Sequence, residues 1–508
     1  MPVIFGYLLQ NTSFFSGLTN PTDANTYISF MNQAKDGHVL FTNMYTSEEV
    51  PYVLFRPTYL IAGLSGLMTG LPNIFVYHLF RIIGILTFIF FLNRLISIYF
   101  KDKKERAYTF IVCLFASGFG FLLKLLTLFG LRGFGSVDLW VGDANNFLIL
   151  LGHPHTIFSI ALMAASVYYF LEWNRNLNIK YIVLSAFFTL ILGFEHVYSV
   201  ITLCLAIGVF ILIRFFSEKS IEWKKVGHLA IFAAIVSVPI IYNFIVFTKI
   251  SVFVSWNAQN ALETPRIPYV IAGYGLMFVA LILTILSKKT ETKKEDVWFL
   301  VYWILIVFIL IYSPFNIQRK FLEGVHIPFG IITGIFLFRL LKPKVSRVAD
   351  NNKASYLIFL IVIFMILTNI YVYTIMITNL DNGRGYFPYS VNRYLYREEA
   401  EALNWLAENS KPDEAILSTY NIGNYIPAYM NRRVYLGHWA QTIDFEKKAK
   451  EVNDFYRMEK QISNLDKIKY VWYGVDEKML NQNFMPPYNL SSIVFQNNLV
   501  RIYKIEQL

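Results

Sequence analysis

Charged residues are scarce in this chain. Asp, Glu, Lys and Arg make up 16% of its 508 residues, whereas soluble proteins carry about a quarter. Apolar residues account for 56% of the sequence, and several apolar runs are long enough to cross about 30 Å of hydrocarbon. The composition excludes an ordinary soluble domain and predicts an integral membrane protein. The net charge of +11 does not indicate nucleic-acid binding, because the basic residues concentrate in short segments between apolar runs.

Cysteine is nearly absent as well. The chain has two cysteines, Cys113 and Cys204, and both fall inside apolar runs. This excludes a disulfide framework and a metal site built from several thiolates.

The apolar runs predict an α-helical polytopic protein with about ten spans, some of them shorter than the usual 20 residues. We expect these spans at about 73–98, 107–130, 148–171, 179–193, 196–214, 226–247, 268–287, 297–314, 325–341 and 355–378.

The segments between these spans alternate in charge. One set carries 19 Lys and Arg residues and the alternating set carries 5. The positive-inside rule places the first set in the cytoplasm. The opening segment and the C-terminal region are then extracytoplasmic, on the outer side of the plasma (inner) membrane. Residues 57–71 are apolar but short and Gly-rich, and we expect them to lie at the outer interface rather than to cross.

The chain therefore divides into three predicted regions: an extracytoplasmic opening loop with interfacial helices at 1–72, a multi-spanning domain at 73–379 and a soluble extracytoplasmic α/β domain at 380–508. In the third region, residues 396–410 have the apolar spacing of an amphipathic helix. Alternating strands and helices follow. We expect strands at 414–418, 432–437 and 468–474, a helix at 423–430, and a hairpin that turns at 497–498.

Polar side chains from distant parts of the chain fall at the predicted outer boundary. They are Asp23 and Tyr27 in the opening loop, His78 and Arg81 near the start of the first span, Asp143, His153 and His155 before the third span, Glu195 and His196 between two short spans, and Gln318, Arg319 and Lys320 in an outer loop. Each has an ordinary explanation, such as a hydrogen-bonded histidine or a solvated loop charge. A cation within a span, such as Arg81, usually lines a cavity or has an anionic partner.

Together these side chains suit a reaction between an anionic lipid head group and a polar acceptor. Arg and Lys bind phosphate or pyrophosphate strongly and offset charge on a leaving group. A carboxylate can take a proton from an acceptor hydroxyl. The histidines would bind phosphate, relay protons or ligate a divalent metal, although their spacing is not a standard metal-binding pattern.

Several motifs, in their order and spacing, resemble those of GT-C glycosyltransferases and of a bacterial group of uncharacterised GT-C-like proteins. The motifs are NPTDANTY, FTNMYTSEE, VYHLFR, DANNFLILLGHPH, QRKFLEG and RRVYLGHWAQT. GT-C enzymes normally have a span before the first external loop, whereas about twenty residues precede Asp23 here. Several GT-C families also carry a second acidic residue where this chain has Ala24.

The resemblance implies an inverting glycosyltransferase with a polyprenyl-phosphate or pyrophosphate sugar donor and an acceptor that is a glycan, a lipid or a protein. Nucleic acid is not an expected partner. By the resemblance Asp23 is the catalytic carboxylate, and Arg319 and Lys320 hold the lipid phosphate. We group Arg81, His78, Tyr27 and Gln318 with substrate binding. Further candidates for binding phosphate or a divalent cation (Mg or Mn) are His153, His155, Glu195, His196 and Asp143.

Other interpretations remain open. A transporter or flippase of lipid-linked saccharide would also be polytopic, but transporters usually carry their polar residues near the midplane, often in paired repeats. A scaffold or sensor would explain the outer α/β domain but not the charged residues at the boundary. Asp23 itself could cap a helix that begins near Ala24.

Overall fold

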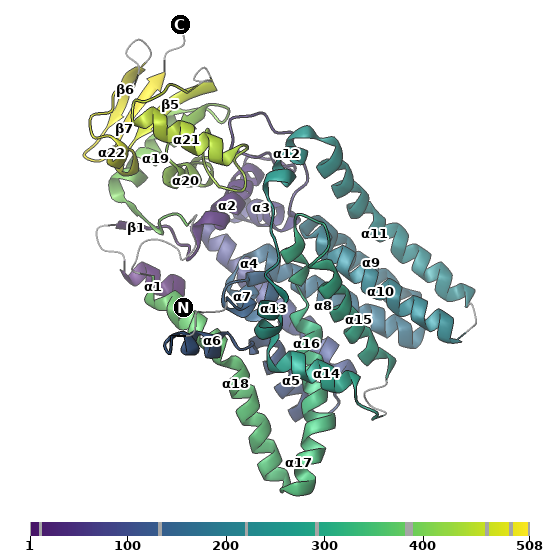
Figure 1. Cartoon of the computed structure of the whole chain (residues 1–508). Helices are drawn as coiled ribbons and strands as arrows, with labels where there is room; N and C mark the ends of the chain where they lie inside the picture. Colours follow the sequence, from purple (N-terminus) through teal and green to yellow (C-terminus); the bar gives the residue numbers. More distant parts are fainter. Residues whose placement is uncertain are drawn as a thin grey trace. The chain divides into compact units, whose positions relative to one another are not determined.

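The computed structural model describes residues 2–9, 13–130, 135–218, 222–289, 294–380, 390–462, 467–486 and 491–505. The described chain forms two compact units (Figure 1). The helical unit comprises Phe80–Lys249 and Ala261–Thr374, and the sheet unit comprises Met1–Leu79, Ile250–Asn260 and Ile375–Leu508.

The helical unit is a bundle of long apolar helices. Its helices are most of α4 (Asn73–Tyr99), α5 (Lys103–Phe115), α6 (Gly120–Thr127), α7 (Asn146–Leu151), α8 (Pro154–Asn176), α9 (Ile179–Glu195), α10 (Val197–Glu218), α11 (Trp223–Lys249), α13 (Ile267–Tyr274), α14 (Leu276–Ile285), α15 (Glu295–Leu310), α16 (His326–Ile335), α17 (Lys342–Val348) and most of α18 (Asn351–Thr378). Short 3-10 turns lie at Val137–Leu139, Gly142–Ala144 and Gln318–Leu322, and a π-helical turn at Phe336–Leu341 joins α16 to α17.

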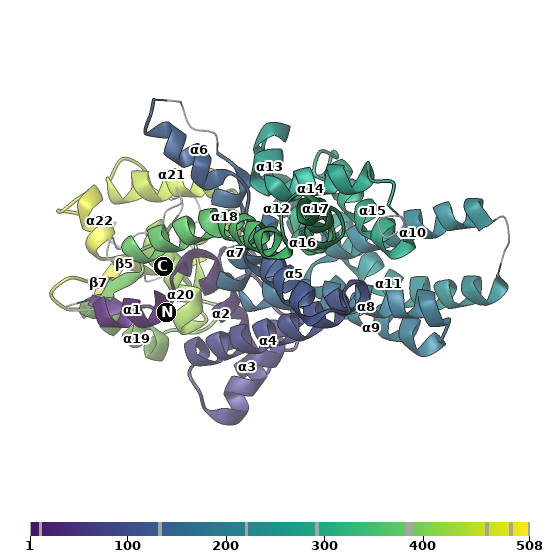
Figure 2. The ribbon, with the colours of Figure 1, turned by 90° about the horizontal axis from the view of Figure 1, so that it is seen from below.

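Helix α16 lies at the centre of the bundle, packed against α5, α14 and α15 (Figure 2). All ten of its residues are buried. A helix that is apolar on every side is stable only when other helices or lipid surround it. Gly330 and Gly334 allow the close approach of α5, because a Cβ at either position would lie within 2.5 Å of Cys113 or Thr109.

The outer helices of the unit have exposed apolar surfaces. Helices α4, α11 and α18 expose rows of large apolar side chains, among them Leu86, Ile241 and Phe244. Among the described residues, six helices are long and apolar enough to cross a membrane, or up to eight if each of two bent helix pairs counts as one span. The chain is therefore a multi-pass membrane protein. All ten predicted segments contain helix, but α9 and α15 are 17 and 16 residues long, so the count of ten spans stays a prediction.

One bent pair shows how a break inside the bundle is stabilised. Between α5 and α6 the chain turns by 50°. Asp138 accepts hydrogen bonds there from the backbone N–H groups of Gly118 and Gly120, at 2.9 and 3.2 Å. Ser117 N–H donates to the carbonyl of Met365. A broken helix is tolerated at membrane depth when neighbouring groups satisfy its backbone in this way.

The sheet unit contains a five-stranded sheet of strand order β4-β3-β5-β7-β6. Strand β3 pairs in parallel with β4 and β5, and the other pairs are antiparallel. The C-terminal elements are β2 (Tyr394–Tyr396), α19 (Arg397–Asn409), β3 (Ala415–Leu417), α20 (Tyr420–Met430), β4 (Arg433–Val434), α21 (Phe445–Tyr456), β5 (Ile468–Tyr473), α22 (Val475–Leu480), β6 (Ser491–Gln496) and β7 (Arg501–Ile505). Each strand and helix predicted for this region is present, and Asn497 closes the β6–β7 hairpin through its N–H to the carbonyl of Val500.

Helices cover both faces of this sheet. Side chains alternate along β5, so that Trp472 packs with the core beneath α19 and α20, while Tyr473 packs with the core beneath α21. This alternation is the period-2 pattern of a strand buried on both faces.

The opening segment belongs to the same unit. It contains α1 (Pro2–Leu9), β1 (Ser13–Phe15), α2 (Pro21–Lys35) and α3 (Pro57–Thr69), and α12 (Ser251–Gln259) joins it from the middle of the chain. Strand β1 pairs with β2, and α2 packs on α20 with Asn25 donating to Asn424 at 2.8 Å. Helix α3 has 13 residues, about 20 Å of helix, which is too short to cross a bilayer.

The charge alternation makes a prediction about sidedness. Ser217 and Ala261 are both exposed, and the alternation places them on opposite sides of the membrane. In a background that lacks Cys113 and Cys204, we expect Ala261→Cys to react with an impermeant thiol reagent in intact cells. Ser217→Cys should react after permeabilisation alone. The opposite labelling pattern would overturn the predicted orientation.

Candidate active site

The exposed face of α2 carries the predicted catalytic residue. Helix α2 begins at Pro21, with Asn20 as its N-cap, and eleven of its fifteen residues are buried. Asp23 and Tyr27 are partly exposed and lie one turn apart, on the same side of the helix. The interpretation of Asp23 as the cap of a helix that begins near Ala24 is wrong, because Asp23 already lies in the first turn.

Asp23 is in contact with a histidine from the C-terminal region. His438 Nε2 lies 2.9 Å from Asp23 Oδ1. The His438 side chain is 4% exposed and the Asp23 side chain 43% exposed. The pair therefore combines a buried imidazole with a carboxylate that solvent or a substrate can reach.

Backbone hydrogen bonds hold His438 in a tight turn. Ala440 N–H donates to His438 Nδ1 at 3.1 Å, and Thr442 N–H donates to the His438 carbonyl at 2.9 Å. The Thr442 hydroxyl accepts from Gly437 N–H at 3.0 Å and donates to the Tyr45 carbonyl at 2.7 Å. The turn at 437–442 is thus tied to itself and to the opening segment.

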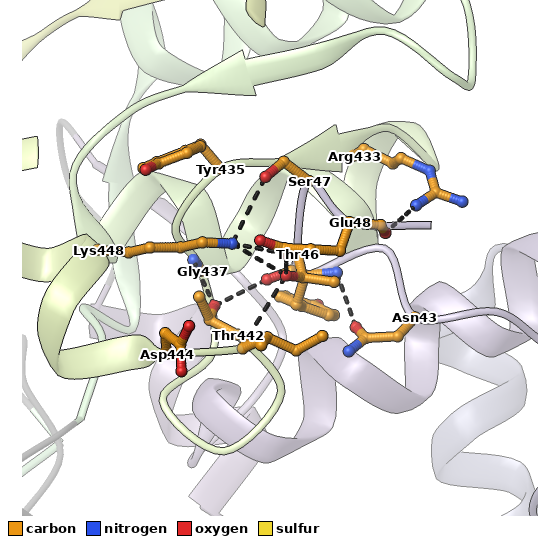
Figure 3. A network of polar contacts seen from close by, with 12 residues as sticks. Asn43, Thr46, Ser47, Glu48, Arg433, Tyr435, Gly437, Thr442, Asp444 and Lys448 are labelled. Atoms are coloured by element: carbon orange, nitrogen blue, oxygen red, sulfur yellow. Dashed lines mark hydrogen bonds and ion pairs between the residues drawn. The ribbon is translucent and has the colours of Figure 1, made fainter. Parts of the chain in front are cut away.

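A second contact docks the opening segment on α21 (Figure 3). The Lys448 ammonium lies 2.6 Å from Glu48 Oε2 and 3.2 Å from Thr46 Oγ1, and Thr46 also donates to Glu48. Burial lowers the pKa of Lys448, against the opposing effect of Glu48. Burial raises the pKa of Glu48, but the hydrogen bonds from Lys448 and Thr46 outweigh it, so the pKa of Glu48 lies below its usual value.

Lys448→Met should therefore destabilise the sheet unit. It removes the hydrogen bonds to a charged partner, and we expect an unfolding free energy lower by about 1–2 kcal/mol. The matched control is Lys447→Met, because Lys447 is 72% exposed and should change stability little. The lowered pKa of Glu48 predicts that the difference between wild type and Lys448→Met is present above pH 4.5 and shrinks as Glu48 is protonated in acid. Equal melting temperatures at pH 7 for the two variants would contradict this.

An aromatic stack surrounds Tyr27. Its ring stacks on Tyr59 at 4.7 Å and 3°, and the Arg56 guanidinium lies 5.5 Å from the Tyr27 ring centre. Arg56 has a φ of 52°, a left-handed conformation that is uncommon for a residue other than glycine. His78, which was grouped with substrate binding, lies 2.9 Å through its Nε2 from the carbonyl of Gly17.

In the helical unit the loop cations have partners of their own. Lys320 lies 3.1 Å from Asp143, and the Arg319 guanidinium lies 5.2 Å from the Trp140 ring centre. Gln318 accepts from Thr264 N–H and donates to the Ser313 carbonyl, so its amide links its own loop to the segment that contains Thr264. The structure thus brings together Asp143 and Lys320, two of the predicted site residues.

Three of the predicted histidines form one cluster in the helical unit. His153 stacks on His155 at 5.8 Å, and His155 meets the edge of His196 at 4.9 Å. His196 Nδ1 lies 2.8 Å from the buried Glu323 carboxylate, which Ser199 also contacts at 2.7 Å. Within the described part of the chain, no group of three or more His, Cys, Asp or Glu side chains is arranged to hold a metal ion.

The remaining candidates are Arg81, which lies within α4, and Glu195. The Arg81 guanidinium donates to the carbonyl of Leu151 at 2.8 Å. It thereby satisfies a backbone carbonyl at the C-terminal end of α7. Glu195 is the last residue of α9 and is 6% exposed.

Three residues of these clusters were missed in the sequence. His438 and Glu323 fall inside quoted motifs, whereas Arg56 lies outside them. His438 belongs to RRVYLGHWAQT, and Glu323 to QRKFLEG. The presence of a polar residue inside each of these two motifs could have marked His438 and Glu323 as candidates. The sequence contains nothing that pairs His438 with Asp23.

No protein-family model matches the chain, and no curated protein matches it. Among solved structures, the chain is similar to ArnT from Cupriavidus metallidurans bound to undecaprenyl phosphate. That similarity has a TM-score of 0.55 and 10% identity, and covers 99% of this chain and 96% of ArnT. The chain is also similar to an Archaeoglobus fulgidus oligosaccharyltransferase tethered with an acceptor peptide. There the TM-score is 0.54 and the identity 14%, over 94% of this chain and 68% of the transferase.

Both are GT-C glycosyltransferases. The chain has the GT-C fold. The resemblance found in the sequence motifs is thereby confirmed at the level of the fold. The same oligosaccharyltransferase is also known in complex with Zn and sulfate, and there the TM-score is 0.51 at 13% identity.

Proposed function

We propose that this GT-C-fold protein is a glycosyltransferase that moves a sugar from a polyprenyl-phosphate or pyrophosphate donor to an acceptor at the membrane–water boundary. The observation that carries the proposal is the contact between Asp23 and His438, at 2.9 Å. It gives a half-exposed carboxylate a buried hydrogen-bond partner. The similarity to ArnT, a structure with bound undecaprenyl phosphate, over nearly the whole chain supports the same class of donor.

In the proposed reaction Asp23 is the general base. It takes the proton of an acceptor O–H or N–H group as that atom attacks the anomeric carbon of the sugar. The bond between that carbon and the phosphate oxygen breaks, and the lipid phosphate leaves with the electron pair. A single displacement of this kind inverts the anomeric configuration. General bases contribute about 10² to 10⁴ in rate.

Arg319 and Lys320 are the proposed ligands of the leaving phosphate. Charge-assisted hydrogen bonds to phosphate are about twice as strong as neutral ones, and they offset the charge that builds on the leaving oxygen. Asp143, 3.1 Å from Lys320, holds the ammonium in place before a phosphate arrives. No step is assigned to a metal ion.

The test is direct transfer. Purified protein in nanodiscs is supplied with undecaprenyl-phosphate-linked radiolabelled hexoses and a membrane extract as acceptor. We expect label to leave the undecaprenyl-linked donor for an acceptor and undecaprenyl phosphate to be released. A flippase would instead move the intact donor across a liposome membrane without releasing label from the lipid, and that result would overturn the proposal.

A further inference from the structure

We infer that His438 is a positioning residue that fixes the orientation of the Asp23 carboxylate as a neutral N–H donor. The inference rests on the proposed function, because Asp23 is the proposed base. It concerns the C-terminal domain, to which the sequence assigns no role in the reaction.

The tautomer of His438 follows from its two contacts. Nδ1 receives the backbone N–H of Ala440 at 3.1 Å, so Nδ1 must offer a lone pair and carries no proton. The proton of the neutral ring is then on Nε2, which donates to Asp23 Oδ1 at 2.9 Å. The hydrogen bond to one ring nitrogen thus determines the role of the other.

The ring has little freedom to leave this position. Asn260 donates to the Ala440 carbonyl at 2.9 Å, and Gln259 donates to the Thr442 carbonyl at 2.8 Å. Both amides come from α12 and its C-cap. They hold the turn from one side while the Tyr45 carbonyl holds Thr442 from the other. A positioning group must itself be locked by its surroundings to be effective.

A neutral donor suits a carboxylate base. An imidazolium beside Asp23 would stabilise the carboxylate anion more strongly and lower its basicity. A neutral Nε2–H orients one oxygen of Asp23 and leaves the side chain, 43% exposed, able to accept a proton.

Two substitutions separate positioning from structural support. The Gln side chain in His438→Gln is long enough to place an amide N–H near the position of Nε2, where it can donate to Asp23. The shorter Asn in His438→Asn can accept the Ala440 N–H but does not reach Asp23. We expect His438→Asn to keep its melting temperature and to lose about 10- to 100-fold in kcat, as expected for one hydrogen bond to a charged group, with KM unchanged. His438→Gln should stay within about 5-fold of wild type. A structural role predicts the reverse order, and that order would overturn the inference.

A double variant tests whether His438 acts through Asp23. In an Asp23→Asn background, His438→Asn should cause no additional loss, because a residue that acts through Asp23 has nothing left to position. An additional 10-fold loss would contradict the inference.

The tautomer can be measured without any substrate. The chain has eight histidines, so protein labelled with ¹⁵N-histidine gives few ring signals, and the signal that disappears in His438→Asn belongs to His438. We expect a protonated Nε2 and an unprotonated Nδ1. A wild-type protein that transfers no sugar but shows this tautomer would refute the proposed function and leave the contact intact. A protonated Nδ1 would refute the inference itself.

Discussion

Asp23→Asn should lower sugar transfer by about 10² to 10⁴, the contribution of a general base, while binding of undecaprenyl phosphate persists. Asn has nearly the shape of Asp and can still accept the hydrogen bond from His438 Nε2. What it loses is the negative charge and the ability to take a proton. The measurement is single-turnover transfer in nanodiscs, together with donor affinity and melting temperature.

The control for Asp23→Asn lies at the C-terminal end of the same helix. Asp36 follows the last turn of α2 and accepts from Asn431 at 2.7 Å, so Asp36→Asn changes a carboxylate of the same segment outside the proposed site. It should transfer sugar at nearly the wild-type rate. Near-normal transfer by Asp23→Asn would remove the catalytic assignment and direct attention to Asp143 and Glu195.

The architecture was largely accessible from the sequence, because it depends on apolar length and periodicity. Long apolar runs predict the helices of the helical unit, and short strand-like runs predict β5 and the β6–β7 hairpin. Span counting is less certain where a helix is short or broken, as at α9, α15 and the bend between α5 and α6. There the backbone is satisfied by side chains such as Asp138, and composition alone does not show that.

The candidate site was accessible in part. Asp23 and Lys320 were found as charged residues at the predicted boundary, and the pairing of Lys320 with Asp143 joins two predicted residues. The partner of Asp23 was not found, since His438 is separated from it by 415 positions and the contact depends on the packing of α2 against the C-terminal region. His78 and Gln318 each have a backbone partner, the carbonyls of Gly17 and Ser313, and their role in substrate binding stays a prediction.

The second large effect concerns binding of the lipid phosphate. Replacing both Arg319 and Lys320 by Gln should weaken binding of undecaprenyl phosphate by about 100-fold, since each removes a charge-assisted hydrogen bond to the phosphate. Binding of undecaprenol, which has no phosphate, should not change. The control replaces two exposed cations, Lys101 and Lys104. It should change neither the affinity for undecaprenyl phosphate nor the affinity for undecaprenol.

Substitution of Asp143 distinguishes a phosphate-binding role of Lys320 from a structural role. In the structure the Asp143 carboxylate pairs with the Lys320 ammonium at 3.1 Å. A phosphate must therefore displace this carboxylate or share the ammonium with it. Asp143→Asn removes the competing charge, and we expect undecaprenyl phosphate to bind several-fold more tightly to that variant, with the gain abolished by Lys320→Gln. If Lys320 serves only to neutralise Asp143, then Asp143→Asn leaves the affinity unchanged and Lys320→Gln acts through stability alone. Affinity and melting temperature measured on the same four proteins, wild type, both single variants and the double variant, separate these outcomes.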